Sequence, residues 1–243
     1  MSPPRLPRYG GVDVLRGCAV VLMVAYHFSF DLNYYGLLRI DFYNQPFWLN
    51  ARASIVTLFL GTAGISLVLA SRNAINWRSR FLRLGMLAGC AALVTASSYF
   101  LFPESWIFFG VLHFIALASL LGLPFLRWHW PTLLAGLALL VIGLSVALPA
   151  FDHPWLQWFG LMTYKPITED YVPLLPWFGV FLTGIFLGQL LLHQPGLATI
   201  RVWQPQGRVC RWAAFAGRHS LMIYLLHQPL LMGVLYLALR MVR

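Results

Sequence analysis

Long apolar stretches, separated by short polar connections, dominate the pattern of hydrophobic and polar positions along the chain. A helix that crosses a membrane needs about 20 consecutive, mostly apolar residues. The pattern therefore predicts an all-α integral membrane protein, a bundle of about seven transmembrane helices. The predicted spans are Val12–Phe30, Ser54–Ala70, Leu82–Phe102, Trp106–Leu126, Pro131–Leu148, Val172–Leu192 and Leu221–Met241.

The composition supports a membrane protein over a soluble one. Of the 243 residues, 60% are hydrophobic and only 10% are charged, whereas a soluble domain is about 25% charged. The net charge of +10 would suggest a nucleic-acid partner in a soluble protein, but arginines in short loops are typical of membrane topology. We expect one transmembrane domain over residues 1–243, surrounded by lipid, with no nucleic-acid partner. The three cysteines form no ligand pair, so we expect no metal site.

The distribution of basic residues predicts the orientation in the membrane. With the N-terminus in the cytoplasm, 12 of the 17 Lys and Arg residues lie on the inner side, as the positive-inside rule requires. The C-terminus then lies on the outer, periplasmic side of the cell inner (plasma) membrane. The inner residues are Arg5, Arg8, Arg16, Arg72, Arg78, Arg80, Arg83, Arg127, Arg201, Arg208, Arg211 and Arg218.

The first span, VLRGCAVVLMVAYHFSFDL, carries three ionisable side chains that a simple membrane anchor does not need. Arg16 precedes His27 by 11 residues, which is a rise of about 16 Å along a helix. Asp31 follows His27 by four residues, so both side chains share one helix face. A carboxylate there can orient the imidazole of a general base. The alternative is a histidine at the membrane edge that reaches water beside a surface aspartate.

Two further histidines lie within predicted spans, where ionisable groups usually face a cavity or a partner. His113 is predicted at a depth similar to that of His27, where it can line the same cavity and stabilise an oxyanion. His227 is followed by Gln228 and Pro229, and a helix kinked at a proline often exposes polar groups. Each histidine can instead form a structural hydrogen bond to a neighbouring helix.

Arginines at the inner ends of spans are candidates for binding phosphate, because a guanidinium makes paired hydrogen bonds to it. Arg16 and Arg83 are the first candidates, and a plain positive-inside signal is the alternative for most others. The two long outer loops are rich in aromatic and hydrogen-bonding residues that suit a carbohydrate or a lipid headgroup. An interfacial aromatic belt is the alternative for their tryptophans. The second span carries Gly61, Ala63 and Gly64, which suit a contact within the chain or in a homo-oligomer.

Five segments in order resemble the bacterial relatives of heparan-α-glucosaminide N-acetyltransferase, a transmembrane acyltransferase family. They are DVLRGCAVVLMVAYHFSFDL, LFLGTAGISLVLASR, GVLHFIALASLL, PLLPWFGVFLTGIFLG and GRHSLMIYLLHQPLL, and the resemblance runs from Arg8 to about Leu231. It implies transfer of an acetyl group from cytosolic acetyl-CoA to an amine or hydroxyl of a sugar or glycan outside. The catalytic histidine of the family lies near the far side of the membrane, where His27 is the best match.

The resemblance and the residues together assign roles to three sets of side chains. The catalytic set is His27, Asp31 and His113. The set that binds the acetyl-CoA donor is Arg16, Arg83, Arg72, Arg218 and His227, and the acceptor set is Asn33, Tyr34, Arg39, Asp41, Glu169 and Asp170.

Two other functions fit the intramembrane histidines. One is a transporter or permease for lipid or small molecules, in which the histidines relay protons. The other is a haem b protein with His27 and His113 as axial ligands.

Overall fold

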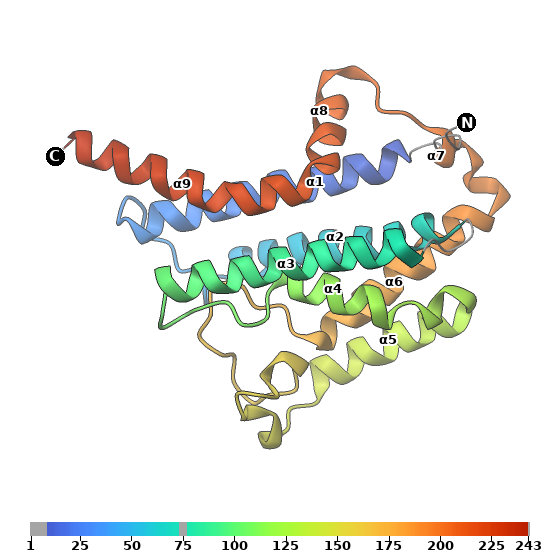
Figure 1. Cartoon of the computed structure of the whole chain (residues 1–243), viewed down its shortest axis with the longest axis horizontal. Coiled ribbons are helices and arrows are strands. Elements are labelled where there is room, and N and C mark those ends of the chain that lie inside the picture. Colours follow the sequence, from blue (N-terminus) through green and yellow to red (C-terminus); the bar gives the residue numbers. More distant parts are fainter. Residues whose placement is uncertain (1–8, 73–76, 243) are drawn as a thin grey trace. The chain divides into compact units, whose positions relative to one another are not determined.

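Helices and connecting loops form the computed structural model, which describes residues 9–72 and 77–242 (Figure 1). No strand occurs among these residues. Within them, five helices are long and apolar enough to cross a membrane, which confirms an all-helical multi-pass membrane protein. These are α1 (Gly10–Tyr34), α2 (Pro46–Ser71), α3 (Trp77–Leu101), α6 (Leu174–His193) and α9 (Ser220–Val242). Arg5 and Arg8, which contribute to the predicted orientation, lie outside the described residues.

The fourth and fifth predicted spans are occupied by shorter helices, α4 (Val111–Leu121) and α5 (Trp130–Ser145). Helix α4 begins after Gly110 and ends at Gly122, and a 3-10 turn, η1 (Pro124–Arg127), follows it. The apolar residues on both sides of α4 therefore form loops and turns rather than helix. The count of seven membrane-crossing helices stays a prediction.

Five short elements connect the long helices or lie beside them. Among them, α8 is unexpected, because the sequence pattern predicts only an arginine-rich loop there. The elements are η2 (Pro149–Asp152), η3 (Gln157–Phe159), η4 (Pro195–Leu197), α7 (Ala198–Val202) and α8 (Gly207–Arg218).

The chain groups into two compact units, and α2 begins in the first and continues into the second. The first unit comes from Met1–Phe59 and Gln194–Arg243, and the second is Leu60–His193. In the first unit, apolar side chains of α1, α2 and α9 pack together as a core of Ala19, Val20, Met23, Ile55, Phe59, Ile223 and Tyr224.

Helices α1 and α9 of the first unit run in the same direction. Gly217, just before α9, packs on Asp13 near the start of α1. At the other end, the hydroxyl of Tyr35 donates to the carbonyl of Met232 at 3.4 Å. Helix α8 sits at the starting ends of both helices, and the Gly17 face of α1 lies against the backbone of Ala213. There is no room for a Cβ on Gly17, so this contact depends on glycine.

In the second unit, α6 is the most buried helix, and Phe181, Leu182 and Ile185 are fully shielded from solvent. Glycines let its backbone approach two neighbours. Gly64 of α2 lies against Phe181, and Gly136 of α5 lies against Gly179. The small residues of the predicted second span therefore serve a contact within the chain at this point.

Candidate active site

A cluster of four polar side chains joins α1 to α9 in the first unit. The rings of His27 and His227 meet edge to face, with centroids 4.9 Å apart. The side-chain amide of Gln228 donates to Oδ1 of Asp31 at 2.7 Å, and Asp31 is only 1% exposed. The cluster forms because His27 and Asp31 are one turn apart on α1 and face consecutive residues of α9.

Backbone carbonyls fix which nitrogen of each histidine carries the proton. Nδ1–H of His27 donates to the carbonyl of Met23 at 3.0 Å, and Nδ1–H of His227 donates to that of Tyr224 at 2.7 Å. Because a carbonyl only accepts, Nε2 of each neutral ring holds the lone pair. Nε2 of His227 is buried and has no hydrogen-bond partner. Both rings can therefore take up a proton at Nε2.

Asp31 was expected to orient the imidazole of His27, and the structure gives that task to a different group. Nδ1 of His27 is held by the carbonyl of Met23, whereas the Asp31 carboxylate accepts from Gln228. Gln228 is not among the predicted site residues, although a polar residue between His227 and Pro229 in the apolar segment LLHQPLL is a signal that could have identified it. His227, which was predicted to bind the donor, lies beside His27, and its role in donor binding stays a prediction.

The loop after α1 brings together three of the predicted acceptor residues. Oδ1 of Asn33 accepts from the amide of Ile40 at 2.7 Å, and Asp41 accepts from the amide of Asn44 at 2.9 Å. The side-chain amide of Asn44 and the backbone amide of Tyr43 hold the pKa of Asp41 below its usual value. An open pocket lies here, and Tyr34 is not part of its wall. It is lined by Asn33, Gly36, Leu38, Arg39, Ile40, Asp41, Phe42 and Tyr43.

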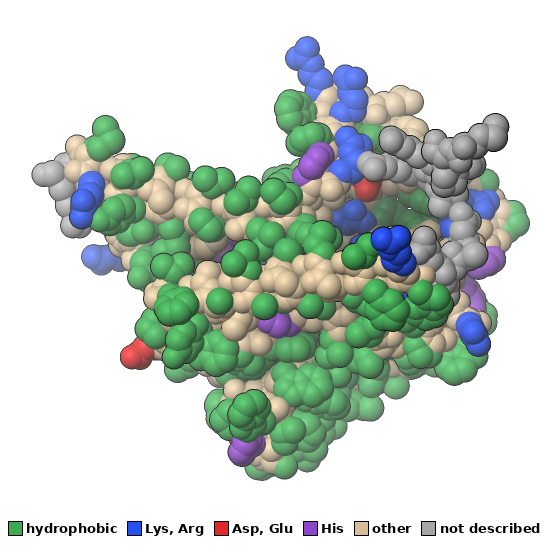
Figure 2. Space-filling view, in the orientation of Figure 1, with side chains coloured by type: hydrophobic (Ala, Val, Ile, Leu, Met, Phe, Trp, Pro, Cys, Tyr) green, Lys and Arg blue, Asp and Glu red, His purple; other side chains and the backbone are tan. Residues whose placement is uncertain are grey.

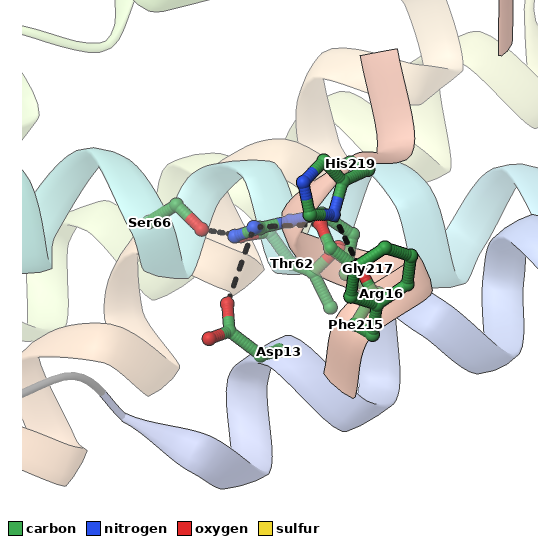
Figure 3. Close-up of polar contacts among 7 residues, drawn as sticks. All are labelled: Asp13, Arg16, Thr62, Ser66, Phe215, Gly217 and His219. Carbon is green, nitrogen blue, oxygen red and sulfur yellow. Dashed lines mark hydrogen bonds and ion pairs between the residues drawn. The ribbon is translucent and has the colours of Figure 1, made fainter. Parts of the chain in front are cut away.

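Arg16 lies near the opposite end of α1, where it ties α1 to α8 (Figure 3). Its Nη1 is 3.5 Å from Oδ1 of Asp13 and donates to the carbonyl of Gly217 at 3.4 Å. The backbone of Ala213 covers Gly17, so α8 fills the space beside this glycine. Arg218 ends α8 and is exposed.

His113 lies in the second unit, where both of its ring nitrogens are engaged. The amide of Gly110 donates to Nδ1 at 3.2 Å, so Nε2 carries the proton and contacts Oγ1 of Thr95 at 3.0 Å. Thr95 in turn donates to the carbonyl of Ile107 at 2.7 Å. These bonds hold the start of α4 to α3 and leave no lone pair for a reacting group or for haem iron.

The other predicted residues of the second unit occupy two places. Asp170 accepts from the amide of Val111 at 2.9 Å and Glu169 from the hydroxyl of Ser105 at 2.6 Å, so both carboxylates are bonded to the segment that leads into α4. Arg72 ends α2, and Arg83 lies exposed on α3. The structure thus brings His27, Asp31 and His227 together and places His113, Arg72, Arg83, Glu169 and Asp170 in the other unit.

The profile of one family, described as heparan-alpha-glucosaminide N-acetyltransferase, catalytic, matches residues 8–229. The chain belongs to this family. The match spans nearly the whole chain and includes the cluster of His27, Asp31, His227 and Gln228. The resemblance seen in the five sequence segments is confirmed, and the chain is a membrane acetyltransferase in general terms. No curated protein matches the chain, and no solved structure does.

Proposed function

We propose that this acetyltransferase takes its acetyl group from acetyl-CoA on the cytoplasmic side of the inner membrane. The acceptor is an amine or hydroxyl of a sugar or glycan on the outer side. Family membership supports the reaction class. The shared direction of α1 and α9 supports the topology, because the first and last of seven spans must run the same way. In this proposal α4 and α5 complete the seven, and the N-terminus is cytoplasmic.

His27 is the general base, and the observation that carries this role is its tautomer, which leaves Nε2 without a proton. With Nδ1–H bound to Met23, Nε2 is available to take the proton from the acceptor nitrogen or oxygen. The acceptor then forms a bond to the thioester carbonyl carbon, the carbon–sulfur bond breaks, and the CoA thiolate leaves. The thiolate recovers the proton from the imidazolium. In a variant of this mechanism, His27 is acetylated first and the acceptor then attacks acetyl-histidine.

Asp31 and His227 support the charge that develops on His27. A carboxylate one turn away favours an imidazolium, and its hydrogen bond from Gln228 keeps it in place. The ring of His227, with centroid 4.9 Å from that of His27, gives the cluster a second proton acceptor at Nε2. His113 has no part in this mechanism because its own hydrogen bonds use both nitrogens.

Donor and acceptor approach His27 from opposite ends of α1. Arg16 and Arg218 hold the phosphates of CoA. The rise of about 16 Å from Arg16 to His27 is close to the length of the pantetheine arm. Asn33, Arg39 and Asp41, which line the open pocket at the end of α1, bind the acceptor together with Tyr34.

The test is the release of CoA thiol from acetyl-CoA by purified protein, with and without a glucosamine-type acceptor. We expect His27→Ala to lower the acceptor-dependent rate about 100-fold or more, the contribution typical of a general base. His153→Ala is the matched control, because His153 is exposed in a loop, and it should retain the wild-type rate. Full activity of His27→Ala, or thiol release that no acceptor stimulates, would overturn the proposal.

A further inference from the structure

Helix α8 has one face packed against α1 and the rest exposed. Ala214 and Gly217 are buried, and Gly217 lies against the backbone of Asp13. The exposed part contains large apolar side chains, since Val209 is 82% exposed and Trp212 is 70% exposed. Such side chains on a short amphipathic helix need an explanation beyond the packing of the chain itself.

The exposed part of α8 divides into two edges with different chemistry. Val209, Trp212 and Ala216 follow each other at intervals of three and four residues and form an apolar edge. Arg208 and Arg211 are three residues apart and form a basic edge, which continues past the half-exposed Phe215 toward Arg218. The sequence from Tyr171 to Arg243 contains no Asp or Glu, so no nearby acid in that segment offsets this charge.

The direction of α8 relates these edges to the membrane. Figure 1 shows α8 running across α1 and α9 at the ends where those two helices begin. If α1 and α9 cross the membrane, α8 lies along its surface. In Figure 2 the hydrophobic side chains over α8 gather on the side toward the length of α9, and the Lys and Arg side chains gather on the opposite side and at the tip.

We propose that α8 is an interfacial helix that binds anionic phospholipid. Its apolar edge, Val209, Trp212 and Ala216, enters the boundary between headgroups and acyl chains. Its basic edge, Arg208 and Arg211, contacts the phosphates of anionic lipids in the same leaflet. This arrangement is the usual one for helices that lie on membranes, with apolar and basic residues segregated across the helix. The proposed lipid binding by α8 does not depend on the acetyl-transfer mechanism.

The experiment places an environment-sensitive fluorophore on position 209. Val209→Cys is made in protein whose free cysteines, Cys18, Cys90 and Cys210, are replaced by alanine. The labelled protein in neutral detergent is titrated with phosphatidylglycerol or phosphatidylcholine micelles. We expect a blue shift of the emission at a much lower concentration of phosphatidylglycerol.

Charge variants test the basic edge in the same assay. Because each arginine near an anionic surface contributes about fivefold in affinity, R208Q/R211Q should raise the phosphatidylglycerol midpoint roughly 25-fold. R208K/R211K should keep the midpoint within about threefold, and R52Q/R240Q, which removes equal charge outside α8, should leave it unchanged.

Three results would overturn the proposal. They are an emission that does not respond to lipid, equal midpoints for the two lipids, and displacement of the lipid signal by CoA alone. The last result would make the basic edge a site for the phosphates of CoA. A normal elution volume in gel filtration, required of every variant, ensures that a changed midpoint reflects binding rather than unfolding.

Discussion

At the scale of single residues, the buried hydrogen bond from Gln228 to Asp31 contributes more to the free energy of unfolding than an exposed side chain does. Gln228→Leu keeps a similar volume but leaves the buried carboxylate without this donor, which costs about 1–3 kcal/mol of unfolding free energy. We expect a correspondingly lower midpoint when unfolding is followed in detergent. Gln194→Leu, at an exposed position, should change the unfolding free energy by less than about 0.5 kcal/mol. Equal stability of the two variants would contradict the buried pairing.

The stability of the loop after α1 depends on pH because of Asp41. Its pKa is lowered by the Asn44 side chain and by the Tyr43 amide, so the folded loop favours the carboxylate. This stabilisation is present above the ordinary pKa of about 4 and is lost as the pH falls through the lower folded value.

Asp41→Asn should therefore increase hydrogen exchange of the Tyr43 and Asn44 amides about threefold to tenfold at neutral pH. At pH 2–3 the two proteins should converge, because the wild-type carboxyl becomes protonated. Glu104→Gln, an exposed substitution in another loop, should leave these amides unchanged. A difference between wild type and Asp41→Asn that persisted undiminished at low pH would show that charge is not the cause.

The helical period alone predicted that His27 and Asp31 share a face of α1, and the structure agrees. The same reasoning had no means to find Gln228 as the partner of Asp31. The two residues are 197 positions apart, and local spacing carries no information about which helices become neighbours. The hydrogen bond from His27 to the carbonyl of Met23 was missed for a different reason. Every histidine in a helix has a carbonyl one turn back that can accept from Nδ1, so the sequence does not show whether this carbonyl or Asp31 binds the ring.

At the scale of elements, glycine sets the distance between α1 and α8. Gly17→Ala would drive a Cβ into the carbonyl of Ala213, so the helices must separate. We expect a loss of about 1–3 kcal/mol of unfolding free energy, as overpacking usually causes. Gly233→Ala on α9 has nothing within 4 Å of the new Cβ and should be neutral or stabilising, since alanine favours helix. The order of the two melting temperatures checks the contact, and a stable Gly17→Ala would contradict it.

Hydropathy predicted the long helices well, because twenty apolar residues in succession have few alternatives to a spanning helix. It failed at the start of α4, where an apolar sequence is held as a loop by side chains. The amide of Ile107 donates to Oγ of Ser98 at 2.9 Å, and Gly110 binds His113. It also missed α8, because arginines every few residues hid an amphipathic helix within an apparently polar connection.

At the scale of the whole molecule, the parallel course of α1 and α9 predicts that the two ends of the chain lie on opposite sides of the membrane. Alkaline phosphatase, which is active only outside the cytoplasm, should be active when fused after Arg243. It should be inactive when inserted after Gln206, between α7 and α8. Activity at Gln206 and none at Arg243 would reverse the proposed orientation, and equal activity at both would show that α9 does not cross the membrane.

The central claim is that an acetyl group is transferred across the membrane with His27 as the general base. The most direct measurement uses sealed proteoliposomes with radiolabelled acetyl-CoA on one side and an amino-sugar acceptor only on the other. We predict labelled acceptor with the wild-type protein and a rate at least about 100-fold lower with His27→Ala. Transfer at the wild-type rate by His27→Ala, or label on the acceptor only when it shares a side with acetyl-CoA, would contradict the account.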